Sequence, residues 1–193
     1  PAPGDFPDVP WEQRRAGLIA VGRFHECKRY EMAVEIVDEL RRRGHDISLT
    51  VAGQPDRRRY GARLEALAAT RRWFRIVNNL SREDLAAEIA RHRYGIHCMF
   101  EEHFGIAPAE MQRAGCITFV HNSGGPVEIV GGDRRLTFDA VADAVEKIAA
   151  VVTDRSLECR LRQEAAARAG LFTVDRFCES IRALVAGFES NGR

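Results

Sequence analysis

Residues 101–110, with the sequence EEHFGIAPAE, set two carboxylates around a glycine-centred loop. A buried strand is expected to end before this loop and a helix to begin near Gly105, with Pro108 in the first turn, where a missing N–H costs little. The backbone amides at such a helix start have no partner inside the helix, so they can bind an anion. Carboxylates accept hydrogen bonds from sugar hydroxyls. The segment therefore fits a phosphorylated sugar, although a dipole-stabilising Glu102 and a solvated Glu110 explain the pattern equally well.

A second group of charged residues follows the first expected strand, in the sequence GRFHECK. Gly22 allows close approach of the backbone, and the cations Arg23 and Lys28 suit a diphosphate. Only Lys28 and Lys147 are lysines in a chain that otherwise uses arginine. Taken alone, this piece is better explained as solvated cations near a helix start. It lacks GxGxxG, which argues against a dinucleotide site, and no GK[ST] follows a glycine-rich loop, which excludes a P-loop.

The segment HNSGGPVEIV, residues 121–130, forms a third candidate feature. Two glycines and a proline predict a tight turn after a strand. The segment is either a simple loop or a wall of a pocket at the edge of the sheet.

Alternating strand and helix patterns predict the fold class. Short apolar runs at 18–22, 47–53, 74–77, 94–100, 116–120 and 135–138 are typical of buried strands, and helical spacing separates them. This order predicts an α/β fold, a doubly wound parallel sheet of about six strands, with ligands at the carboxyl ends of the strands. Those ends are Gly22, Gly53, Leu80, Glu102 and His121.

Composition narrows the class of protein. A formal net charge of +1 argues against a nucleic-acid partner. The five cysteines have no metal-ligand spacing and fit reduced thiols, no apolar run is long enough to span a membrane, and no signal-peptide pattern is present. We therefore expect a cytoplasmic protein with no metal site, and peripheral attachment to a membrane stays open.

We expect residues 1–15 to be a linker and residues 16–193 to form one domain that ends in a helix at about 173–189. Apolar residues recur at helical spacing along that last helix: Val174, Phe177, Ile181, Leu184, Val185 and Phe188. Its first half is more readily explained as a core helix. Its last two turns are expected to be poorly buried or to take part in a contact between chains, including a homodimer.

These motifs together resemble a known family. GRF with Lys28, REDLAAEIARHRYGIHC, EEHFGIAPAE, MQRAG and HNSGGPVEIV occur in order and resemble the nucleotide-sugar-binding C-terminal half of retaining GT-B glycosyltransferases of family GT4. The resemblance covers nearly the whole chain from about Leu18. EHFGIAPAE with HNSGGP is most similar to the α-1,2-mannosyltransferase branch of lipid-linked oligosaccharide assembly.

The resemblance implies roles for individual residues. Arg23 and Lys28 neutralise the departing diphosphate, Glu102 lies beside the transferred sugar, and Glu110 holds the ribose hydroxyls. Gly53 and Leu80 neighbour the base. The donor's phosphates and sugar lie on the loop and helix start, formed by His103, Phe104, Gly105, Ile106 and Ala107.

The resemblance also implies a partner and an activity. Full-length relatives carry an N-terminal acceptor domain of similar size, so this chain is expected to be the donor half of a retaining hexosyltransferase that needs no metal, and to be inactive alone. Two alternatives stay open: a non-catalytic nucleotide-sugar-binding module, and a fragment of a GT-B sugar-nucleotide epimerase. Turnover after the missing half is restored separates the first alternative from an enzyme, and product analysis separates the second.

Overall fold

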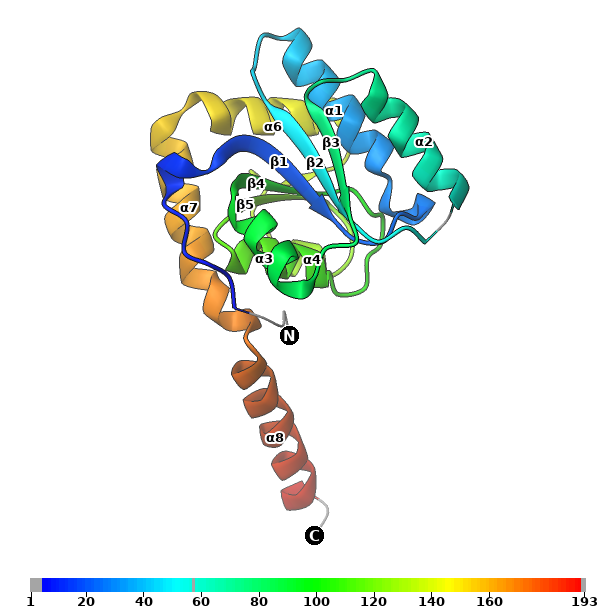
Figure 1. Ribbon diagram of the computed structural model, residues 1–193. Coiled ribbons are helices and arrows are strands. Elements are labelled where there is room, and N and C mark those ends of the chain that lie inside the picture. Colours follow the sequence, from blue (N-terminus) through cyan, green and yellow to red (C-terminus); the bar gives the residue numbers. More distant parts are fainter. Residues whose placement is uncertain (1–4, 57, 192–193) are drawn as a thin grey trace.

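The computed structural model describes residues 5–56 and 58–191 and folds them around one parallel sheet (Figure 1). In this described part the sheet has six strands in the order β3-β2-β1-β4-β5-β6, every neighbouring pair parallel. The strands are β1 (Arg15–Val21), β2 (Ser48–Gly53), β3 (Phe74–Asn78), β4 (His92–His97), β5 (Ile117–His121) and β6 (Thr137–Phe138). The predicted α/β fold, a doubly wound parallel sheet, is confirmed.

Helices connect the strands and also follow the last strand, β6. They are α1 (Tyr30–Arg42), α2 (Arg58–Ala69), α3 (Arg82–Ala90), α4 (Ile106–Arg113), α5 (Pro126–Ile129), α6 (Val141–Thr153), α7 (Arg155–Ala169) and α8 (Val174–Asn191). The described residues also form short 3₁₀ turns at η1 (Trp11–Gln13), η2 (Glu26–Lys28) and η3 (Gly170–Phe172). The Ser81 hydroxyl accepts a hydrogen bond from the Asp84 amide at 3.0 Å, so the predicted cap of α3 is present.

Both faces of the sheet are covered, because successive side chains of a strand point to opposite faces. Leu18 and Ala20 of β1 belong to the larger core cluster, which α1, α2 and α6 cover. Ile19 and Val21 belong to a second cluster beneath α3 and α4. This double burial explains why β1 reads as a continuous apolar run instead of an alternating one.

The N-terminal segment packs on this core. Trp11 is buried, its Nε1 donates to Glu158 Oε2 at 3.2 Å, and its ring meets Tyr94 edge to face at 6.2 Å. β1 begins at Arg15, within the stretch expected to be a linker. Residues 5–15 thus belong to the packed domain, and residues 1–4 lie outside the described part. The difference arises from tertiary packing of Trp11, which local composition does not reveal.

The close approach of the chain at the ends of β1 and β2 depends on two glycines. Gly22 has φ +149, and its N–H donates to the Ala52 carbonyl at 3.1 Å. A Cβ on Gly53 would lie 1.8 Å from the Gly22 carbonyl oxygen, and a Cβ on Gly22 would lie 2.9 Å from the Tyr30 hydroxyl. The two loop backbones therefore approach each other in a way that only glycine permits.

The last helix, α8, extends away from the rest of the chain (Figure 1). Leu184, Val185 and Phe188 are 60%, 52% and 80% exposed, which confirms the expected poor burial of its last two turns. Val174, Phe177 and Ile181 are 46%, 47% and 44% exposed, so the explanation of the first half as a core helix is wrong. The apolar spacing was correctly assigned to one helical face, but sequence alone does not say what that face contacts.

Removing α8 tests how far the rest of the fold depends on it. Truncation after Thr173 should change the melting temperature by less than about 2 °C, because none of the apolar side chains on that face is buried. Ile148→Ala, at a fully buried position of α6, is the matched control and should cost about 2–5 kcal/mol of unfolding free energy. A truncation that melts as early as the Ile148→Ala variant contradicts the assigned independence of α8.

Gly53→Ala tests the close approach of the β1 and β2 loops. The added Cβ meets backbone, which cannot move aside as a side-chain tip can, so we expect a loss of about 1–3 kcal/mol or more. Gly61→Ala is the control: apart from its chain neighbours and the backbone of its own helix, no atom lies within 4 Å of the added Cβ. Because Gly61 is inside α2, we expect a gain of about 0.5–1 kcal/mol. Chemical denaturation measures both, and equal effects at the two positions would contradict the packing.

Candidate functional site

The predicted site residues gather at the carboxyl edge of the sheet, where β1, β2, β4 and β5 end (Figure 1). Gly22 follows β1, Gly53 ends β2, and Glu102 follows β4. Leu80 is half-buried in the turn between β3 and α3. This is the edge at which ligands of open parallel sheets bind.

An ion pair joins the first and third candidate segments. Lys28 Nζ donates to Glu102 Oε2 at 2.6 Å, and both side chains are mostly buried, with 17% and 18% of their surface exposed. Lys28 Nζ also lies 3.3 Å from Met99 Sδ. Residues 74 positions apart in the chain thus meet at the end of β1 and β4, as a shared ligand site requires.

His97, the last residue of β4, lies beneath this pair. Its Nε2 is 3.5 Å from Glu102 Oε2, the oxygen that Lys28 also contacts. The neighbouring His97 and Lys28 hold the pKa of Glu102 at about 2, well below its ordinary value. Burial, with a smaller effect of Lys28, lowers the pKa of His97. Glu102 is therefore a carboxylate, and His97 is neutral at pH 7.

Arg23 lies on the same loop as Lys28 but has a different partner. Its Nη1 donates to Asp56 Oδ2 at 3.2 Å, and 69% of the side chain is exposed. Asp56 lies on the loop after β2, three residues beyond Gly53, which contacts Gly22. The structure thus brings Lys28 and Glu102 into contact and leaves Arg23 at the rim.

The loop that carries Glu102 is clasped by the segment HNSGGPVEIV. The Glu101 amide donates to Ser123 Oγ at 2.9 Å, and the Gly125 amide donates to the Glu102 carbonyl at 2.8 Å. A Cβ on Gly124 would lie 2.3 Å from the Glu102 carbonyl oxygen, so that glycine permits the contact. The two glycines of this segment therefore allow its backbone to pack closely against the loop that carries Glu102, in addition to forming a turn.

Helix α4 begins directly after this loop. Gly105 is its N-terminal cap with φ +92, in the left-handed region that favours glycine. Ile106 opens the helix and Pro108 lies in the first turn, as expected. His103, Phe104 and Ile106 are exposed, so the predicted phosphate loop presents its surface to solvent. The first-turn amides have no carbonyl of a preceding turn to bond, which is the property of an anion site.

Glu110 lies on the buried face of α4. Its side chain is 5% exposed, and Oε1 is 2.6 Å from Nη2 of Arg82 at the start of α3. Burial raises the pKa of Glu110, and Arg82 opposes that rise. The solvated alternative for Glu110 is therefore wrong. The residue lies about one helical turn after Ile106, on the face of α4 that packs against the rest of the domain.

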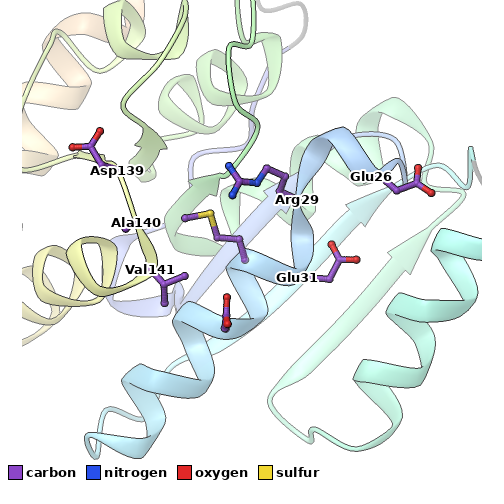
Figure 2. A pocket seen from close by; sticks show the side chains of 8 residues that line it. Glu26, Arg29, Glu31, Asp139, Ala140 and Val141 are labelled. Carbon is purple, nitrogen blue, oxygen red and sulfur yellow. The ribbon is translucent and has the colours of Figure 1, made fainter.

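A hollow of about 450 Å³ adjoins the site between the starts of α1 and α6 (Figure 2). Glu26, Arg29 and Glu31 line it on one side, and Asp139 and Val141 on the other. Arg29, the residue after Lys28, has φ +52. The loop between β1 and α1 thus faces two spaces, the Glu102 loop and this hollow.

Two further features bear on the class of protein. In residues 5–56 and 58–191 no group of three or more His, Cys, Asp or Glu side chains could hold a metal ion. No helix among the described residues has the length and apolar character to cross a membrane. The five cysteines are free thiols, and burial raises the pKa values of Cys98 and Cys116 to about 12.

Sequence reasoning missed the partners of the acidic residues. It noted His97 only as part of a strand, and it gave no role to Asp56 or Arg82. A histidine at the end of β4, five residues before Glu102, was the available signal for His97. Nothing in the local pattern identifies Asp56 or Arg82, because their contacts join separate loops.

Known proteins resemble the chain in sequence. The family model described as "Glycosyl transferases group 1" matches residues 5–168. GDP-Man:Man(3)GlcNAc(2)-PP-Dol alpha-1,2-mannosyltransferases are similar: that of Xenopus laevis is 35% identical over 105 residues (51% of this chain, 22% of that protein), and that of Homo sapiens 27% over 194 residues (90% and 39%). The chain spans less than two fifths of the length of these relatives.

Solved structures resemble it in fold. The pneumococcal O-GlcNAc transferase in complex with UDP and GlcNAc superposes with a TM-score of 0.78 at 14% identity, over 95% of this chain and 38% of that one. The C-terminal domain of a glycosyl transferase group 1 family protein from Francisella tularensis superposes with a TM-score of 0.67 at 12% identity, over 83% and 88%. With the family match over residues 5–168, these results confirm the resemblance seen in the motifs: the chain belongs to the group 1 glycosyl transferases.

Proposed function

We propose that this chain is the donor-binding domain of a retaining glycosyltransferase and that it holds a nucleotide-diphosphate sugar across the carboxyl edge of the sheet. One observation carries the proposal: Lys28 and Glu102 meet, mostly buried, directly before the N-terminus of α4. A cation for phosphate, an acceptor for sugar hydroxyls and free backbone amides then lie together. These are the groups that such a donor needs.

Binding requires Lys28 to change partner. In the donor-free chain its charge is balanced by Glu102, and the diphosphate takes over that balance when it binds. Arg23, exposed at the rim and paired with Asp56, adds a second cation by turning inward. The amides of Gly105, Ile106 and Ala107 complete the phosphate site.

The nucleoside lies on the opposite side of the loop in this proposal. Glu110 accepts hydrogen bonds from the ribose hydroxyls, while Arg82 opposes the rise that burial causes in its pKa. Gly53 and Leu80, at the ends of β2 and β3, lie against the base. The buried position of Glu110 lets one oxygen stay with Arg82 while the other faces the ribose.

The reaction is then a transfer with retained configuration. The bond between the sugar C1 and the β-phosphate oxygen breaks, and the acceptor oxygen bonds to C1 on the same face. The acceptor's proton passes to the departing phosphate oxygen. Lys28 and Arg23 stabilise the negative charge that grows on the diphosphate, so the proposed mechanism uses no metal ion.

Two observations direct the choice of donor and partner. The relatives' names give GDP-Man as donor and an alpha-1,2-mannosyl transfer, which makes GDP-mannose the first donor to test. Those relatives are more than twice as long as the matched part. We therefore propose that the acceptor is bound by a further domain, that the chain alone does not turn over, and that the complete enzyme works at the cytoplasmic side of a membrane.

Substitution of the cations tests the diphosphate site. Lys28→Ala with Arg23→Ala should raise the Kd of GDP by about tenfold or more, because each charge-assisted hydrogen bond is worth about 1.5–3 kcal/mol, and should change the Kd of guanosine by less than about twofold. Lys147→Ala removes the other lysine of the chain, on α6, and is the control. Calorimetric titration measures the Kd values of GDP and guanosine for the unmodified chain, the double variant and Lys147→Ala. Equal losses for GDP and guanosine, or a similar loss in Lys147→Ala, would remove the assignment.

Glu110→Gln tests the ribose contact. We expect the Kd of GDP to rise about tenfold and that of 2′,3′-dideoxy-GDP to stay nearly constant, because only the first ligand has hydroxyls to donate. Glu83→Gln, beside Arg82 and exposed in the first turn of α3, is the control for a change of charge near the site. If both ligands weaken alike, Glu110 serves only to pair with Arg82.

A further inference from the structure

His97 is a buried polar residue whose role the proposed contacts do not explain. Its side chain is 4% exposed at the end of β4. Its Nε2 is one of the buried side-chain atoms that, among the described residues, lack a hydrogen-bond partner of good geometry. At 3.5 Å, the contact with Glu102 Oε2 is at the limit for a hydrogen bond.

This arrangement costs stability in the donor-free chain. A buried donor without a good acceptor loses about 1–3 kcal/mol relative to a satisfied one. An apolar side chain of similar volume would avoid the cost, since the position of His97 is almost fully buried. The position of His97 therefore needs an explanation other than packing.

The geometry around Glu102 supplies that explanation. Lys28 and His97 approach the same oxygen, Oε2, at 2.6 Å and 3.5 Å, so the stronger Lys28 bond holds the carboxylate away from the histidine. When Lys28 turns to a diphosphate, Glu102 loses its short contact. Only His97 then remains, of the two groups seen on Oε2, to keep the carboxylate in place.

We propose that His97 is a positioning residue that takes over Glu102 when Lys28 leaves it for the diphosphate of the donor. The histidine acts as a neutral donor through Nε2–H, with Lys28 and Glu102 as the charged groups facing it. It does not touch the donor, because its exposed surface is nearly nil. Without it, Glu102 follows Lys28 toward the phosphates and leaves the sugar. The binding part of this inference rests on the proposed function.

The first test needs no ligand. Side-chain NMR can measure the pKa of Glu102, which His97 and Lys28 are expected to hold well below its ordinary value. Removing the Nε2 donor in His97→Leu should raise that pKa, whereas His97→Gln, whose amide reaches about as far as Nε2, should keep it low. If His97→Leu fails to fold, His97→Asn gives the same comparison, because its shorter amide stays polar but does not reach Glu102.

The control is the other buried histidine of the same strand. His92 is fully buried at the start of β4, but its ring nitrogens both have hydrogen-bond partners, the Glu88 carbonyl at 2.8 Å and Thr50 Oγ1 at 3.0 Å. His92→Gln should reduce stability without changing the pKa of Glu102. This separates a local effect on Glu102 from a general loosening of β4.

The second test measures binding of GDP-mannose and GDP by calorimetry. His97→Leu should lower the affinity for GDP-mannose relative to GDP by about tenfold, and His97→Gln should restore most of it. In a Glu102→Gln background, His97→Leu should add no further loss, because the residue acts through Glu102.

The outcomes are distinguishable. An unchanged Glu102 pKa in both His97→Leu and His97→Asn, or an additive loss in the Glu102→Gln background, overturns the role of His97. Absence of nucleotide binding by the unmodified chain overturns the proposed function, and the pKa comparison still decides whether His97 controls Glu102. A shifted pKa with unchanged sugar preference overturns the takeover on donor binding.

Discussion

The ion pair between Lys28 and Glu102 is the interaction on which the candidate site depends. Both groups are more than four-fifths buried, so each is costly to leave unpaired. In the ion pair each charge neutralises the other, so neither is buried unpaired when no ligand is bound. Under the proposed function, a diphosphate replaces the carboxylate as partner of Lys28, so that cation is not left unpaired. After that exchange Glu102 needs another hydrogen-bond donor, and the neighbouring His97 can supply it.

Packing of the loop backbones keeps Lys28 and Glu102 within contact distance. Lys28 lies on a loop fixed by the contact of Gly22 with Gly53, and Glu102 lies on a loop clasped by Gly124 and Gly125. Each contact brings backbone atoms closer than any side chain allows. The glycines therefore do more than permit turns: they set the distance between two loops that come from opposite halves of the chain. A Cβ at one of these glycines would push the two loop backbones apart and so displace Lys28 or Glu102.

The sequence predicts most of the fold because local patterns carry it. Short apolar runs indicate the strands, Ser81 indicates the start of α3, and helical spacing of apolar residues predicts α8. Loop positions at the sheet edge then follow from parallel topology, which brings Glu102 near Lys28. The failures share one cause: Trp11, the Arg82 contact of Glu110 and the exposure of α8 depend on tertiary partners that no local pattern contains.

The two histidines of β4 show where this fold departs from ordinary packing. At the amino end of the strand, His92 is satisfied at both ring nitrogens, by the Glu88 carbonyl at 2.8 Å and Thr50 Oγ1 at 3.0 Å. At the carboxyl end, His97 Nε2 and the nearby Tyr30 hydroxyl, which lies beneath Gly22 and Lys28, have no such partners within the described residues. A stable protein tolerates unpaired buried groups chiefly where a ligand or a change of partner completes them. Both groups lie near Lys28 at the carboxyl edge of the sheet. Under the proposed function, the exchange of partners on donor binding gives His97 an acceptor that it lacks in the donor-free chain.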